Sequence, residues 1–271
     1  MMSAMEVRNV YFDLTAELNG EGEIVVLASG QAVVFYRISI MSKDGDWILR
    51  ETPEACRKAL AVLERHGARY RPGAPLDVRW LAGGWSSHFE FPDAERRRIR
   101  CDFVTRPPRM EAGEISRLFE APEPTEPLPV LGIEPLIRIK QTQRAKDYPV
   151  IGELARLLPP EREIEFTTDP DRILALAPSY GERSRRAPVL VALGGGSRDA
   201  VVVELARELD RLQQQDRARL EKYRRASEPY LREFQLARIG DLNLPQAHER
   251  ICELAERRLP RNLEDEDGAA Q

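Results

Sequence analysis

The sequence predicts an α+β fold: a mixed β-sheet with helices, followed by a mostly helical C-terminal region. Residues 23–28 (EIVVLA) form a short run rich in β-branched side chains, typical of a buried strand. Residues 98–105 begin RIRCDFV and alternate polar and apolar side chains, typical of a strand with one buried face. Residues 198–226 predict a long helix, because apolar side chains recur along one stripe: Val201, Leu205, Leu209 and Leu212.

Local signals predict the other elements. Short apolar runs between turn residues predict further strands at 46–50, 76–81 and 85–91. Thr52 as N-cap and Pro53 at the first helical position begin a helix that ends near Gly67. Further helices are predicted over 31–37, 148–158 and 245–258, and a basic helix through 140–146.

The change of pattern along the chain predicts three parts. Residues 1–165 form the α/β domain, residues 166–263 the helical C-terminal region, and residues 264–271 an acidic disordered tail. Gly194 to Gly196 read as a flexible linker, with Ser197 as the N-cap of the following helix.

The amino-acid composition excludes several classes of function. The 41 basic and 45 acidic residues give a net charge of −4, which excludes a uniformly basic nucleic-acid-binding surface. Three separated cysteines and only three histidines exclude a disulfide framework and a histidine-rich metal centre, so any metal site must use carboxylates. No signal peptide or membrane-spanning run is visible, and we expect a cytoplasmic protein without membrane partners.

Asp44 and Asp46 are the most informative pair of carboxylates. On one strand their side chains would point to the same face, about 6.6–7 Å apart along the strand. Such a pair can share Mg²⁺, which takes one or two carboxylates together with substrate phosphates. Asp102 would add a third carboxylate if its strand lay next to theirs. Ser29 and Gly30, at a strand-to-helix turn, would then cradle the phosphates.

The same residues have a second interpretation. Residues 43–46 (KDGD) lie between two apolar runs, and Asp-Gly at such a place is typical of a β-hairpin turn. Judged by local chemistry alone, the hairpin is the better interpretation of these four residues.

The order of these features resembles the nucleotidyltransferase superfamily with the polymerase-β-like fold. That family shows a hydrophobic strand, a glycine turn opening a helix, an Asp-x-Asp pair about ten residues on, and a third aspartate on a later strand. Here the matching residues are Ser29-Gly30, Asp44 with Asp46, and Asp102. Residues 140–147 also resemble stand-alone bacterial members of toxin–antitoxin and abortive-infection systems, through Lys140, Arg144, Lys146 and Asp147. The resemblance covers roughly residues 23–158.

The resemblance implies an enzyme that transfers a nucleoside monophosphate from a nucleoside triphosphate such as ATP to a hydroxyl of RNA, protein or a small molecule. Asp44 and Asp46 would bind Mg²⁺, and Asp102 would ligate a second metal ion or help deprotonate the acceptor. Lys140 and Arg144, four residues apart on one predicted helix, would hold the triphosphate or an RNA backbone. A solvated basic face explains these two cations equally well. For Lys146 and Asp147 we favour a structural ion pair at the helix junction.

Two departures from the family motivate an alternative. Gln31 follows Gly30 where the family has Ser or Gly, and Gly45 separates the aspartates where the family has an apolar residue. They favour a catalytically inactive member that binds a partner protein, as in a toxin–antitoxin pair. An RNA-binding module that uses Lys140 and Arg144 is a third hypothesis. We interpret His88, in a predicted strand, as structural and Cys101 as a buried, unreactive thiol.

Overall fold

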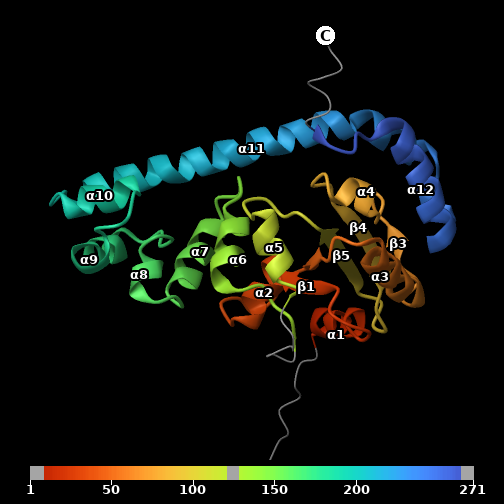
Figure 1. Cartoon of the computed structure of the whole chain (residues 1–271), viewed down its shortest axis with the longest axis horizontal. Coiled ribbons are helices and arrows are strands. Elements are labelled where there is room, and N and C mark those ends of the chain that lie inside the picture. Colours follow the sequence, from red (N-terminus) through yellow and green to blue (C-terminus); the bar gives the residue numbers. More distant parts are fainter. Residues whose placement is uncertain (1–8, 121–127, 264–271) are drawn as a thin grey trace, which may run out of the picture. The chain divides into compact units, whose positions relative to one another are not determined.

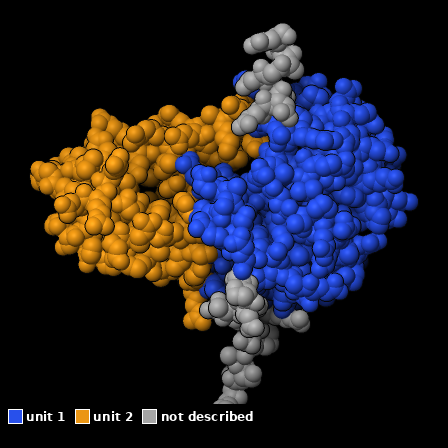
Figure 2. All heavy atoms as spheres, viewed as in Figure 1, with its two compact units in different colours: residues 1–35, 39–131, 225–271 blue, residues 36–38, 132–224 orange. Residues whose placement is uncertain are grey.

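The structure is a computed structural model that describes residues 9–120 and 128–263. Figure 1 labels the helices and strands. The chain divides into two compact units (Figure 2). Unit 1 comprises Met1–Phe35, Ser39–Leu131 and Arg225–Gln271, and unit 2 comprises Tyr36–Ile38 and Gly132–Arg224. The predicted boundary at residue 165 falls inside unit 2, and the predicted acidic tail lies outside the described residues.

Unit 1 contains a five-stranded sheet in the order β1-β2-β5-β4-β3. Its strands are β1 (Val25–Ala28), β2 (Asp44–Leu49), β3 (Arg69–Tyr70), β4 (Ser87–Pro92) and β5 (Arg98–Val104). β2 and β5 are parallel, whereas the other neighbouring strands are antiparallel. This mixed sheet, together with the helices, confirms the predicted α+β class.

The helices of unit 1 are α1 (Val10–Leu18), α2 (Ser29–Phe35), α3 (Pro53–Arg65), α4 (Val78–Leu81), α5 (Ala112–Arg117) and α12 (Leu244–Arg258), with a 3₁₀ turn η1 (Ile239–Asp241). The predicted start of α3 is confirmed, because the Thr52 side chain accepts a hydrogen bond from the Ala55 N–H. Gly67, beyond its end, has φ +64°, a left-handed conformation that favours glycine.

One face of the sheet is packed around Trp47. Its ring is fully buried, stacks on Phe103 with ring centroids 5.3 Å apart, and donates its N–H to Thr15 of α1. A Cβ atom on Gly45 would lie only 2.3 Å from the Trp47 ring and 2.5 Å from Tyr11. The glycine between the two aspartates is therefore required by the bulky tryptophan that follows them.

The predicted strand over residues 76–81 is wrong. Asp77 accepts a hydrogen bond from the Arg79 N–H and begins the short helix α4. Asp is a strong N-cap residue, and this local bond outweighs the apolar run that suggested a strand. Trp80 of α4 and Trp85 donate their N–H groups to the carbonyls of Leu259 and Pro260, so the chain after α12 packs with the sheet in unit 1.

All regular secondary structure in the described residues of unit 2 is helical. This unit contains α6 (Ile133–Lys140), α7 (Asp147–Ala155), α8 (Pro160–Glu163), α9 (Pro170–Tyr180), α10 (Ala187–Leu193) and the first part of α11 (Arg198–Leu236). Ser197 accepts a hydrogen bond from the Ala200 N–H, as expected of an N-cap. The predicted stripe is confirmed, since Val201 and Leu205 are buried in the core of this unit and Leu209 packs against it.

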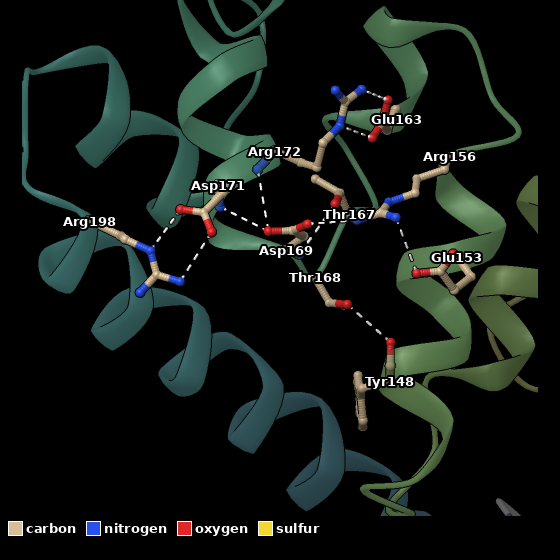
Figure 3. A network of polar contacts seen from close by, with 10 residues as sticks. All are labelled: Tyr148, Glu153, Arg156, Glu163, Thr167, Thr168, Asp169, Asp171, Arg172 and Arg198. Carbon is tan, nitrogen blue, oxygen red and sulfur yellow. Dashed lines mark hydrogen bonds and ion pairs between the residues drawn. The ribbon is translucent and has the colours of Figure 1, made fainter.

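Ion pairs tie the helices of unit 2 together (Figure 3). Asp169 caps α9 through the N–H groups of Asp171 and Arg172 and also binds Arg156 at 2.8 Å. Glu163 accepts two hydrogen bonds from the Arg172 guanidinium. Among the described helices, none is both long and apolar enough to cross a membrane.

Candidate functional site

The three predicted carboxylates lie on one face of the sheet in unit 1. Asp44 and Asp46 both belong to β2, so the hairpin interpretation of residues 43–46 is wrong. The parallel pairing of β2 with β5 places Asp46 directly opposite Asp102. Because alternate residues of a strand share a face, Asp44 lies on the same side. We call Asp44, Asp46 and Asp102 the carboxylate face.

Cations line the same side of the sheet. The Arg100 guanidinium lies 3.5 Å from Asp44 Oδ1, and that of Arg71 lies 3.2 Å from Asp102 Oδ1. His88 of β4 is opposite Asp102, with its Nδ1 atom 2.8 Å from Oδ1. One row across three strands therefore holds Asp46, Asp102 and His88. Asp44 and Asp102 are each contacted by one arginine, which partly offsets the repulsion between the like charges of the carboxylate face.

The donor set suits a hard divalent cation. Asp44 Oδ1 is buried and accepts no hydrogen bond from the described residues, so it retains capacity for a ligand. In the described part of the chain, no three His, Cys, Asp or Glu side chains converge as a metal cluster. Mg²⁺ does not require such a cluster, because one or two carboxylates with phosphate oxygens and water complete its shell. The carboxylates are therefore of the type and number that Mg²⁺ takes from a protein.

The predicted phosphate turn lies beside these carboxylates. Ala28, which precedes it, pairs with Asp46 across β1 and β2. Ser29 has φ +48°, a left-handed conformation uncommon for serine, and it begins α2 instead of capping a helix that starts later. A Cβ atom on Gly30 would lie 2.2 Å from Ser42 Oγ. The missing side chain at Gly30 thus makes room for Ser42.

Gln31, the departure from the family pattern, has a structural role. Its side chain is 1% exposed, accepts a hydrogen bond from Asn9 and donates one to the Ser42 carbonyl at 2.9 Å. These bonds connect α2 to the segments before α1 and before β2. The amide therefore fixes the loop that leads into Asp44.

A cavity of about 770 Å³ opens next to Asp44. Its lining includes Tyr11, Ser42, Lys43, Arg98 and Arg100. Burial raises the pKa of Tyr11 to about 12, so this phenol stays neutral and donates its hydrogen bond to the Lys43 carbonyl. The cavity combines cations with apolar surface, a lining suited to a nucleotide or another anionic ligand.

The predicted basic helix through residues 140–146 is wrong. α6 ends at Lys140, α7 begins at Asp147, and Arg144 lies in the connection, so Lys140 and Arg144 do not share a helix face. Both approach the buried Asp147, Lys140 Nζ at 4.0 Å and Arg144 Nε at 2.8 Å. Asp147 also accepts a hydrogen bond from Thr142 at 2.8 Å. It therefore connects α6 and α7.

Sequence reasoning missed Arg71 and did not place His88 next to Asp102. The signal for His88 is the alternation of residues 87–91 (SHFEF), which puts His88 and Glu90 on the polar face of β4. The pairing of that face with Asp102 depends on strand order, which the alternation does not reveal. Cys101 is fully buried, and burial raises the pKa of its thiol well above the usual range, as expected of an unreactive cysteine.

Comparisons with known proteins find distant structural similarity. Two solved structures from Helicobacter pylori are similar, each with a TM-score of 0.37. One is described as a candidate nucleotidyltransferase, at 11% identity over 77% of this chain and 94% of that chain. The other is JHP933, at 12% identity over 80% of this chain and 95% of that chain. No protein-family model and no curated protein matches the chain.

Proposed function

We propose that this protein is a metal-dependent nucleotidyltransferase. It transfers a nucleoside monophosphate from a nucleoside triphosphate, such as ATP, to a hydroxyl group of RNA, protein or a small molecule. The observation that carries the proposal is the placement of Asp46 opposite Asp102 on parallel strands, with Asp44 on the same face. This geometry provides the paired carboxylates that phosphoryl-transfer chemistry requires.

The residues of the carboxylate face and of the adjacent cavity have separate roles in the proposed reaction. Asp44 and Asp46 would hold Mg²⁺, whose chemistry is to neutralise charge on the attacking and leaving oxygens. The cavity beside Asp44 would bind the nucleotide, with Lys43 and Arg98 close to its phosphates. Arg71 and His88 hold Asp102 in place, so that its second oxygen can face a metal ion or the acceptor hydroxyl. Ser29 and Gly30 remain proposed phosphate contacts.

The roles of Lys140 and Arg144 change in this proposal. Their contacts with Asp147 indicate a structural role in unit 2. We therefore assign the triphosphate to Lys43 and Arg98 of unit 1. The contacts with Asp147 compete with any contact of Lys140 and Arg144 with a nucleotide or with RNA. An Arg144→Ala variant that transfers nucleotide at the wild-type rate would exclude such a contact.

The test is transfer of label from each α-phosphate-labelled nucleoside triphosphate in the presence of Mg²⁺ and cell extract. We expect transfer with at least one nucleotide. Asp46→Asn should reduce it at least about a hundred-fold, because metal ions contribute several kcal/mol and each 1.36 kcal/mol is tenfold in rate. Asp199→Asn, at the exposed start of α11, is the matched control. Absence of both transfer and Mg²⁺-dependent nucleotide binding would refute the proposal.

A second candidate function is a catalytically silent member that binds a partner protein, of the toxin–antitoxin kind. Two observations favour it: Ser42 lies against Gly30, and Ile40 and Met41 are 98% and 74% exposed at the cavity. Exposed apolar side chains at a cavity are typical of a binding surface. Co-expression with the products of neighbouring genes would reveal a stable complex, and Ile40→Asp with Met41→Asp should abolish it.

A further inference from the structure

A serine hydroxyl of the chain itself lies beside the row of Asp46, Asp102 and His88. Ser86 Oγ is 2.9 Å from His88 Nε2, on the side of the imidazole opposite to Asp102. His88 Nδ1 is buried and 2.8 Å from Asp102 Oδ1 in a close contact that lacks hydrogen-bond alignment. The order serine, imidazole, carboxylate places a base next to the hydroxyl and a carboxylate behind the base.

The surrounding backbone holds this arrangement. The Ala74 N–H donates to the Ser86 carbonyl at 2.9 Å, and the Ser87 hydroxyl donates to the Ala74 carbonyl at 2.8 Å. A Cβ atom on Gly73 would lie 2.5 Å from His88 Cδ2, so the imidazole occupies space that only glycine leaves open. Ser86 itself is half-buried and therefore reachable by a ligand on the sheet.

We propose that Ser86 is a nucleotide acceptor, so that the protein nucleotidylates itself. This inference rests on the proposed function, because the carboxylate face must bring the nucleotide. Ser86 Oγ forms a bond to the α-phosphorus of the nucleoside triphosphate. The bond between the α-phosphorus and the oxygen that bridges the α- and β-phosphates breaks. Pyrophosphate leaves with the electron pair, and the hydroxyl proton passes to His88 Nε2. The product is a phosphodiester between Ser86 and the nucleoside.

Self-modification would also regulate the site. The phosphodiester adds a negative charge beside Asp102 and Asp46, and like charges close together repel. The nucleoside would occupy space over the carboxylate face. A modified molecule therefore transfers nucleotide to other acceptors more slowly than an unmodified one, and the reaction limits itself.

The experiment uses the full chain alone, with Mg²⁺ and each α-phosphate-labelled nucleoside triphosphate. We expect an intact mass increase of one nucleoside monophosphate, located at Ser86 by tandem mass spectrometry. Ser86→Ala should abolish labelling, whereas Ser86→Thr, which keeps a hydroxyl, should retain it. His88→Asn should slow labelling at least about a hundred-fold, the usual contribution of a general base. Ser116→Ala, at an exposed serine whose hydroxyl bonds a backbone carbonyl, should label normally.

Transfer to extract acceptors and Mg²⁺-dependent nucleotide binding, measured in parallel, separate the two proposals. Transfer to the extract without label on the chain would overturn the assignment of Ser86 and leave the proposed function standing. Label that persists in Ser86→Ala would overturn it as well. Absence of self-labelling, transfer and nucleotide binding would overturn both. Urea unfolding will show whether His88→Asn folds. If it does not, the Ser86 variants alone test whether Ser86 is the acceptor.

Discussion

The carboxylate face of unit 1 differs in its pairing from Glu163 and Asp169 of unit 2. In unit 2, Glu163 is 2% exposed and receives two hydrogen bonds from Arg172, while Asp169 caps α9 and binds Arg156 (Figure 3). In unit 1, Asp44 has a buried oxygen that accepts no hydrogen bond from the described residues. Asp102 is contacted by the Arg71 guanidinium and the His88 imidazole, both at the same oxygen atom.

The difference separates two uses of the same residue type. A carboxylate with dedicated, aligned donors stabilises the fold, since hydrogen bonds to charged groups contribute about 1.5–3 kcal/mol each. A carboxylate with an unsatisfied buried oxygen costs stability and is retained where a ligand completes its bonds. Glu163 and Asp169 of unit 2 therefore have structural roles, whereas Asp44 of unit 1 keeps a buried oxygen that can accept a bond from a ligand.

The largest expected effect on stability is at Glu163. Glu163→Gln leaves a single acceptor for the two Arg172 donors inside a buried site. We expect a loss of about 2 kcal/mol, within the range for a charged hydrogen bond, because Arg172 is partly exposed. Urea unfolding at constant m-value measures it. Glu161→Gln, exposed on the same helix, should change stability by less than about 0.5 kcal/mol.

A smaller loss is expected at Asp216 of α11. Its carboxylate accepts hydrogen bonds from the Gln143 N–H at 2.9 Å and from Arg219 at 2.9 Å, and it is 5% exposed. Asp216→Asn keeps one acceptor oxygen, so we expect a loss of about 1 kcal/mol. The exposed Asp210→Asn is the control, and equal effects of the two variants would contradict the structural role of Asp216.

Glu134 of unit 2 should make a pH-dependent contribution to the free energy of unfolding. Two hydrogen bonds from Arg162, each 2.7 Å long, lower the pKa of Glu134 below its ordinary value of 4.5. A lowered folded-state pKa contributes stability above pH 4.5, and that stability is lost as the pH falls through the folded-state pKa. Both side chains are partly exposed, so this contribution to the free energy of unfolding is below about 1 kcal/mol. Wild type and Glu134→Gln should differ at pH 7 and converge in acid.

The smallest effect is expected at Asp44. Its contact with Arg100 is 3.5 Å long and partly exposed, and such pairs contribute little. Asp44→Asn should change the free energy of unfolding by less than about 0.5 kcal/mol, or raise it by removing charge beside Asp46. Thermal and urea unfolding measure it, with nucleotide transfer assayed on the same samples. A loss comparable to that of Glu163→Gln would abolish the distinction between the two units.

Local sequence signals identified many elements near the site but not all contacts. The alternation of residues 98–104 and the capping pair Thr52-Pro53 were sufficient for β5 and α3, because both depend on neighbouring residues. The sequence showed Gly45 only as a departure from the family pattern, because the lack of space for a Cβ atom there arises from Trp47 and Tyr11 together. The four-residue spacing of Lys140 and Arg144 predicted a shared helix face, whereas α6 ends at Lys140 and both side chains approach the buried Asp147.

The sequence by itself determined that the protein is α+β and that Asp102 lies on the polar face of a strand. Local periodicity and composition are sufficient for these conclusions. Only the tertiary structure decided that β2 pairs in parallel with β5, which sets Asp46 opposite Asp102, and that β4 brings His88 and Ser86 beside them. Strand order and register depend on packing between residues far apart in the chain, and no local pattern encodes them.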